Sequence, residues 1–525
     1  MSVAPAFAQE HQHPAGERIG TVHFQTSCSP TAQQKFDRAL AYMHSFEFGP
    51  AIAGFTDTAA DDPRCAIAYW GVAVARWTNP FAPAVRPPAQ LKLGMDAVEA
   101  GRKANPKTER ERDYLEAVAR LYTDAATVDQ PTRLAAYEQA MAQLAAKYAD
   151  DREATIFWAL AIAAAAPPTD KTYKNQLKAG AILEKLYPAT PDHPGITHYI
   201  IHSYDTPALA DQAVKAAQRY ATIAPAAPHA LHMPSHTFTR VGAWQESIDT
   251  NIASAAAAER VKGFGEQLHA MDYMVYAYLQ TGQDRAADAT IARLPSIAAV
   301  FDPKAVVGAA PGSAGVFALA AMPARRALER RDWAAAAKLQ PVRSDFPYTE
   351  AITYFARALG ASRTGALDDA KASIAALQEI ADRLTKAGEN YWAEQVRIQR
   401  EGAAAHLALA EGRSAEAVSL MTAAAVREDA TDKAAVTPGP IAPARELLAE
   451  MLLELKRPAD ALKEFQATLK KEPNRFRAVY GAARAARQAG DNATARTYYA
   501  QLIEICTKAD TPGRPEIAEA RGAVK

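Results

Sequence analysis

The chain has 525 residues, of which 49% are hydrophobic and only 8% aromatic. Alanine is abundant and alternating β-branched runs are scarce, which favours an all-α protein with closely packed helices. The 59 basic and 59 acidic residues cancel, so the chain lacks the basic excess of a nucleic-acid-binding protein. No apolar run reaches the roughly 18–20 residues that a membrane-spanning helix needs. We therefore predict neither a nucleic-acid partner nor a membrane span.

The N-terminal residues resemble what remains of an export signal. Residues 6–8, Ala-Phe-Ala, precede Gln9 in the small-x-small pattern of a signal-peptidase site. The charged part and most of the apolar part of such a signal are missing, so we interpret the signal as truncated. We expect a periplasmic or secreted bacterial protein in which residues 1–30 are a signal-peptide remnant and an N-terminal extension. The alternative is a disordered alanine-rich tail.

A repeated helical pattern runs from residue 31 to residue 508. A small residue, an aromatic residue four positions later and a proline eight positions further on recur in GPAIAGFTDTAADDP (residues 49–63) and RPADALKEFQATLKKEPN (residues 457–474). This layout resembles the tetratricopeptide repeat (TPR), in which helical hairpins stack into a superhelix. The resemblance implies a right-handed α-solenoid of about eleven or twelve hairpins. It also implies that the first helix of each hairpin lines the concave face.

One interruption divides the repeats into two arrays. Residues 301–317 hold too many Gly and Pro residues for a repeat helix, and we expect a loop there that reaches over the groove. Residues 31–300 then form an N-terminal TPR array, and residues 318–510 form a C-terminal one, followed by a tail at 511–525. The C-terminal repeats carry no catalytic motif and could bind a protein partner or pair two chains.

Seven of the twelve histidines lie between residues 193 and 269, and their spacing follows the repeat. His198 and His232 are 34 residues apart, as are His202 and His236, and 34 residues is the length of the repeat. Counted back from the turn of each hairpin, equivalent positions hold His198, His202, His229, His232, His236, His269 and Asp272. Imidazoles on adjacent packed helices can share one ion. We therefore predict a transition-metal site, for one ion or a pair, on the concave face.

Four polar residues near these histidines are candidate catalytic groups. Asp272 takes the position of a histidine and could be a ligand or a general base, and Asp205 could also serve as a base. Tyr276 could donate to a substrate, and Arg240 could hold a substrate carboxylate. The alternatives are structural: a salt bridge for Asp272, the start of the next helix for Asp205, packing for Tyr276 and helix capping for Arg240.

Other residues of the same kinds lie outside the histidine stripe. His44 is at the first hairpin turn, from which it could face the cluster as a further ligand, whereas His193 is interpreted as a loop residue. Cys28 and Cys65 are 37 residues apart, about one repeat, which leaves a disulfide or two free thiols equally open. Cys506 is interpreted as part of the core.

Pro234 interrupts the histidine stripe. Its missing N–H removes the hydrogen bond to the carbonyl of Ala230, so we expect a kink that tilts His229 and His232 toward the groove. The alternative is that Pro234 begins a helix and that His232 lies outside it.

Four segments carry a closer resemblance. They are CAIAYWG (65–71), HPGITHYIIHSYDTP (193–207), IAPAAPHALHMPSHTFTRVGAW (223–244) and HAMDYMVYAYLQTG (269–282). They resemble segments shared by a group of exported bacterial TPR proteins. This resemblance implies that the histidine site matters, but it implies no particular activity.

The sequence lacks the nucleophile elbow, the P-loop, the dinucleotide fingerprint and the His-Glu-x-x-His and Cys-x-x-Cys motifs. Any enzyme here must use the histidines, and histidine-rich ligation without thiolates suits copper, iron or zinc. Because we expect an oxidising compartment, we favour copper, or iron, and oxidative chemistry on a small organic substrate in the groove. A zinc-dependent hydrolase, a non-catalytic scaffold for a peptide or protein and a metal carrier are the alternatives.

Overall fold

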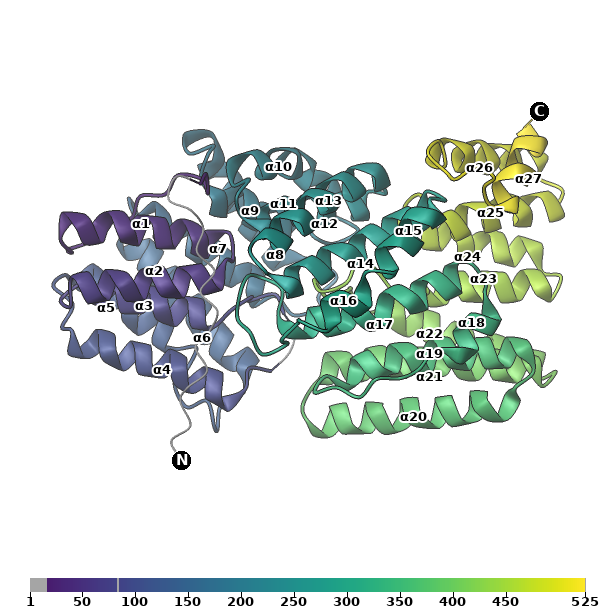
Figure 1. Ribbon diagram of the computed structural model, residues 1–525, viewed down its shortest axis with the longest axis horizontal. Coiled ribbons are helices and arrows are strands. Elements are labelled where there is room, and N and C mark those ends of the chain that lie inside the picture. Colours follow the sequence, from purple (N-terminus) through teal and green to yellow (C-terminus); the bar gives the residue numbers. More distant parts are fainter. Residues whose placement is uncertain (1–16, 83–84, 525) are drawn as a thin grey trace.

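The computed structural model describes residues 17–82 and 85–524, and within them it is all-α (Figure 1). Consecutive helices pack as twelve hairpins over these residues, which confirms the predicted all-α solenoid. The first eight helices are α1 (Pro30–His44), α2 (Phe48–Asp61), α3 (Ala66–Arg76), α4 (Pro88–Lys103), α5 (Glu109–Ala119), α6 (Gln130–Lys147), α7 (Arg152–Ala164) and α8 (Lys174–Leu186), followed by a 3₁₀ turn at Tyr187–Ala189.

The central helices carry most of the histidines. They are α9 (Pro194–Ser203), α10 (Ala210–Ile223), α11 (Pro228–His232), α12 (Pro234–Arg240), α13 (Trp244–Arg260), α14 (Phe264–Gln280), α15 (Asp284–Ile291) and α16 (Leu294–Ala298). Helices α11 and α12 together form the first half of one hairpin, and both pack on α13.

The C-terminal helices continue the same pattern. They are α17 (Gly312–Glu329), α18 (Trp333–Lys338), α19 (Pro347–Thr364), α20 (Leu367–Lys386), α21 (Asn390–Ala410), α22 (Ser414–Asp429), α23 (Ala444–Glu454), α24 (Pro458–Lys471), α25 (Phe476–Gln488), α26 (Asn492–Ile505) and α27 (Pro515–Val524). Helix α17 begins inside the loop that we expected at 301–317, and α27 occupies most of the expected tail.

The hairpin turns follow from local sequence. Gly242 and Gly282 adopt the left-handed conformation directly after α12 and α14, with φ of 71° and 70°, which is the usual way in which glycine ends a helix. Gly242 also has no room for a side chain, because an added Cβ would lie 2.5 Å from the carbonyl oxygen of Pro473. The turn of the central hairpin therefore touches the C-terminal array.

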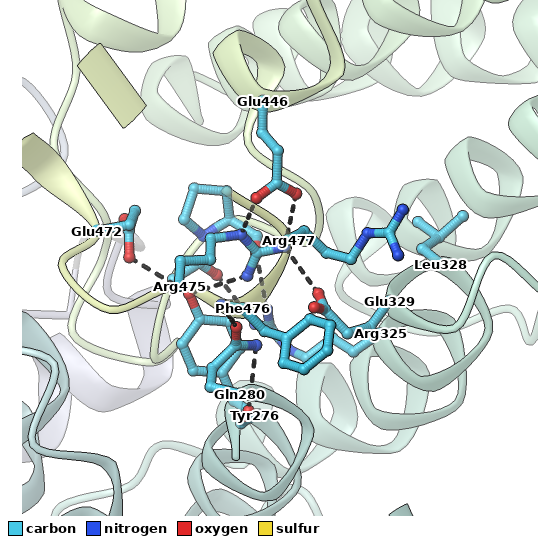
Figure 2. Close-up of polar contacts among 12 residues, drawn as sticks. Tyr276, Gln280, Arg325, Leu328, Glu329, Glu446, Glu472, Arg475, Phe476 and Arg477 are labelled. Carbon is cyan, nitrogen blue, oxygen red and sulfur yellow. Dashed lines mark hydrogen bonds and ion pairs between the residues drawn. The ribbon is translucent and has the colours of Figure 1, made fainter. Parts of the chain in front are cut away.

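A buried network on Arg475 joins the C-terminal helices to α14. Its guanidinium donates to Glu446 on α23 and to Glu329 on α17, at 2.7 and 2.8 Å, and it lies against Tyr276 of α14 (Figure 2). Beside it, the backbone N–H of Phe476 donates to Gln280 of α14. These contacts fix the C-terminal repeats against the helices that carry the histidines.

Two connections reach across the superhelix. In segment 299–311, the Val307 carbonyl accepts a hydrogen bond from the Gly49 N–H. In segment 430–443, Lys433 Nζ donates a hydrogen bond to Asp205. A loop over the groove was expected near 301–317, but the second crossing, from segment 430–443, was not.

The N-terminal and cysteine predictions have mixed outcomes. Residues 1–16, which hold the suspected signal-peptidase site, lie outside the described residues. From residue 17 onward the extension packs into the first repeats, where Phe24 is buried against Trp70. Cys28 and Cys65 form a disulfide, and Cys506 is buried as expected. None of the helices in the described part of the chain is long and apolar enough to cross a membrane.

Candidate metal centre

The six histidines of the predicted stripe converge at the centre of the molecule. They come from α9, α11, α12 and α14, and their residues are at most 7% exposed. The histidines therefore lie in the protein interior, and segments 299–311 and 430–443 contact their neighbours Glu266 and Asp205.

The histidines form two groups of three. Within each group, one ring nitrogen from each histidine lies within 4.8 Å of those of the other two. Site A consists of His198, His202 and His229, and site B consists of His232, His236 and His269. The sites are neighbours, because the ring centroids of His202 and His236 are 5.9 Å apart and those of His229 and His232 are 6.0 Å apart.

The hydrogen bonds of site B fix the protonation of two imidazoles. His232 Nδ1 lies 2.6 Å from Asn251 Oδ1, and the Asn251 amide donates its own N–H to the Ser247 carbonyl, which fixes its orientation. His236 Nδ1 lies 2.9 Å from a carboxylate oxygen of Asp205. Both Nδ1 atoms therefore carry the proton. The two Nε2 atoms then face each other as bare acceptors, 3.1 Å apart.

Site A repeats this arrangement. His198 Nδ1 donates to the backbone carbonyl of His44 at 2.7 Å, so His198 Nε2 is bare in the neutral ring. That atom lies 3.2 Å from His229 Nε2. His202 Nε2 and His229 Nδ1 are buried without a hydrogen-bond partner. A buried nitrogen without a partner is costly unless something that the protein binds satisfies it.

Burial keeps these imidazoles neutral. It is the largest cause that lowers the pKa of each histidine, and it brings the pKa of His198 and of His269 to about 3. Neighbouring imidazoles lower the pKa of His229 and His232 further. At neutral pH the rings therefore have free lone pairs, which is the form that binds a metal ion.

Asp205 organises the outer side of site B. Besides His236, it accepts hydrogen bonds from Arg240 Nε at 2.9 Å and from Lys433 Nζ at 3.2 Å. Burial alone would raise the pKa of Asp205, but Lys433, Arg240 and His236 outweigh it and hold that pKa well below its usual value. Helix α10 begins only at Ala210, so Asp205 lies in a turn and is not the start of a helix.

A pair of buried glutamates borders site A. Glu47 accepts the His229 backbone N–H at 3.3 Å, and a Glu266 carboxylate oxygen without a partner lies 3.9 Å from His229 Nδ1. The Ala310 N–H of segment 299–311 holds the other Glu266 oxygen. Burial raises the pKa of Glu266 to about 7. Glu266 is thus available as an oxygen ligand or proton acceptor beside site A.

A third group, His44, Glu153 and His193, is different because hydrogen bonds use all of its ring nitrogens. Glu153 accepts from both rings, at 2.9 and 2.8 Å. The other nitrogen of His44 lies 3.0 Å from Tyr199 Oη, and that of His193 accepts the Ile196 N–H. His193 lies just before α9, outside the helix as expected, and it is buried and caps α9. The group needs no ion to satisfy its polar atoms.

Two of the candidate catalytic residues lie outside both sites. Asp272 pairs with Arg325 Nε at 3.0 Å, and Tyr276 Oη contacts Glu472 and Arg475 (Figure 2). The Asp272 contact is the salt bridge given as its alternative, whereas Tyr276 is buried against Trp244 and also forms these hydrogen bonds. Arg240, by contrast, binds Asp205 and so supports site B indirectly.

The sequence analysis missed several neighbours of site B. The hydroxyl of Tyr273 lies 3.4 Å from His236 Nε2 and 3.1 Å from the carbonyl oxygen of Thr437, to which it donates. Tyr273 follows His269 by four residues, a spacing that places both on one face of α14 and could have revealed it. Nothing in the local sequence points to Asn251 or Lys433.

The helix carrying the central histidines is broken at Met233. Helix α11 ends at His232, and α12 begins at Pro234, whose missing N–H costs nothing at the first helical position. The kink hypothesis requires that residues 229–241 do not form one straight helix, and they do not. His232 is the last residue of α11, so both descriptions of Pro234 hold in part.

Comparisons with known proteins add little. No protein-family model matches this chain, and no curated protein matches it. Among solved structures, a monomeric mutant of IFIT1 with Gppp-AAAA and the human IFIT1 dimer with m7Gppp-AAAA are each 12% identical. Each covers 92% of this chain and 98% of the other, with TM-scores of 0.37 and 0.36. Naa15/Naa10 bound to HypK-THB is 11% identical over 94% of this chain and 73% of the other, with a TM-score of 0.23. Likeness this low carries no conclusion about this chain.

Proposed function

We propose that this protein is a metal-dependent oxidoreductase in which sites A and B each bind one ion, with copper as the favoured metal. The observation that carries the proposal is the pair of bare Nε2 atoms that face each other in site B, and site A repeats the close approach, with His198 Nε2 3.2 Å from His229 Nε2. In an imidazole complex each metal–nitrogen bond is about 2.0–2.1 Å, so two nitrogens 3.1 Å apart fit one ion at an angle of about 100°. Without a cation the two lone pairs would repel each other.

The donor set favours a transition metal of the copper, iron or zinc group. Imidazole nitrogens suit these ions, whereas magnesium and calcium prefer oxygen ligands. Three histidines leave each ion a free position for oxygen or a substrate atom. Three of the six ligands are oriented by a partner beyond the site: Asn251 and Asp205 hold His232 and His236 of site B, and the His44 carbonyl holds His198 of site A.

The cellular setting of the proposal is an oxidising compartment. The Cys28–Cys65 disulfide supports an exported protein, as the closer TPR resemblance implies. Ligands that are at most 7% exposed do not favour a carrier that must release its ion readily. We therefore place a redox enzyme acting on a small organic molecule before the carrier and the scaffold.

The test is elemental analysis of protein produced with ample copper, iron and zinc. We expect two ions per chain in the wild type. We expect one in each double variant, His232→Ala/His236→Ala for site B and His198→Ala/His229→Ala for site A. Glu153→Gln is the matched control, because it perturbs a buried histidine group that needs no ion, and it should keep two. A wild type with fewer than about 0.2 ions per chain would refute the proposal, since buried three-histidine sites should not lose their metal on purification.

A further inference from the structure

A cavity of the C-terminal array borders site B. Its volume is about 80 Å³, and it is lined by residues of α21, α22, α24 and segment 430–443. One water molecule needs roughly 10–15 Å³ of such space, so the cavity has room for one small molecule. The question is whether its position and its lining suit the substrate of the proposed oxidoreductase.

The position connects the cavity to site B through one layer of side chains. Lys433 and Arg240 both line the cavity, and both donate to Asp205, which accepts the His236 Nδ1–H. Thr437 also lines it, and its carbonyl holds the Tyr273 hydroxyl beside His236. A molecule in the cavity therefore lies against the groups that orient a ligand of site B.

The lining has aromatic walls and unpaired hydrogen-bonding atoms. Phe317, Tyr391 and Trp392 supply the aromatic surface, on which a flat ring packs well. Trp392 is 4% exposed, and its Nε1–H has no acceptor. Gln399, seven residues further along α21, has an Oε1 without a donor. One helix face thus offers a ring-binding surface with a free donor at one end and a free acceptor at the other.

We propose that this cavity binds the organic substrate, and that the substrate is a phenolic compound. A phenol supplies a flat ring for the aromatic wall, and a phenolic hydroxyl can accept from an indole N–H or donate to an amide oxygen. Catechol, with two hydroxyls, is the simplest probe with more than one such group. That the phenolic compound is a substrate rests on the proposed function, whereas its binding is measured on the metal-free protein.

The experiment is a calorimetric titration of the metal-free full-length protein with catechol, and with cyclohexanol as a probe that has a hydroxyl but no aromatic ring. Trp392→Phe keeps a ring and removes the N–H, and Gln399→Leu removes the acceptor at similar size. Each should weaken catechol binding about five- to tenfold, the effect of losing one hydrogen bond. Gln378→Leu on the exposed face of α20 is the matched control and should bind as the wild type does.

The outcomes separate this inference from the proposed function. Catechol binding that weakens in Trp392→Phe and Gln399→Leu, but not in Gln378→Leu, supports the phenolic site. Equal binding by all four proteins, binding of cyclohexanol as tight as that of catechol, or no binding at millimolar catechol would overturn it. Metal content is measured on the same variants and should stay at two ions per chain. A protein that holds two ions and does not bind catechol would refute this inference alone, and a wild type without metal would refute the proposed function.

Discussion

Substituting Asp205 by asparagine tests the architecture of site B most directly. The carboxylate is 9% exposed and accepts hydrogen bonds from His236, Arg240 and Lys433. In Asp205→Asn, the buried Arg240 and Lys433 lose the carboxylate to which both donate. Removing one partner of a buried ion pair typically costs about 3–5 kcal/mol. We expect the unfolding free energy of the metal-free protein to fall by that amount.

The same substitution should also weaken metal binding. An asparagine amide can turn its N–H₂ toward His236 Nδ1, which then becomes an acceptor and moves the ring proton to Nε2. That proton would point at His232 Nε2, at the position proposed for the ion. Loss of a partner that orients a metal-bound histidine usually costs about 10–100-fold in affinity.

Two assays measure these effects. Urea unfolding followed by circular dichroism reports the stability of the metal-free proteins, and competition with a chelator reports the affinity of site B. Asp249→Asn is the matched control, since Asp249 is exposed and accepts only from Gln245. Wild-type metal affinity and a wild-type urea midpoint in Asp205→Asn would refute the assignment of Asp205 as the group that fixes the His236 tautomer.

Two further predictions concern stability away from the metal centre. Cys65→Ser opens a loop of 37 residues, which should lower the free energy of unfolding by about 4 kcal/mol. The wild type in dithiothreitol should then unfold at the same urea midpoint as the variant. A variant that unfolds at the midpoint of the untreated wild type would contradict this. Burial lowers the pKa of His406 to about 3, below the unfolded value of about 6.5. The folding stability that depends on this neutral ring is therefore fully present above pH 6.5 and is lost as the pH falls. At pH 5 the loss is roughly 2 kcal/mol, and urea midpoints at pH 7 and pH 5 should therefore differ less in His406→Leu than in the wild type; parallel shifts would show that His406 is not buried as a neutral ring.

The sequence predicted the fold and the histidine sets because both are periodic. His198 and His232 occupy equivalent positions one repeat apart, and so do His202 and His236, and each pair faces the same direction from equivalent helices. A repeat length and a helical spacing are enough to bring such residues together. The division of the six histidines into two groups falls between His229 and His232, both on α11, and no spacing specifies it.

The features that the sequence did not predict depend on contacts between distant parts of the chain. Lys433 reaches Asp205 across 228 residues, and no local pattern records such a contact. Asp272 and Tyr276 have the right repeat positions for a metal site, but Arg325 and Arg475 bind them from other helices. The crossing by segment 430–443 was missed for the same reason, because that segment belongs to neither the histidine helices nor their repeats, whereas a loop near 301–317 was expected.

Segment 430–443 also bears on how the protein acquires its ions. All six histidines lie within residues 198–269, whereas the segment that covers site B follows more than 150 residues later. Contacts between such distant residues form late in folding, because closing a long loop costs entropy before any contact repays it. We therefore expect a stage at which the central hairpins are formed and their imidazoles are still open to solvent. Ions that bind at that stage would be enclosed when the C-terminal array docks, so the order of assembly would determine whether the finished protein is loaded.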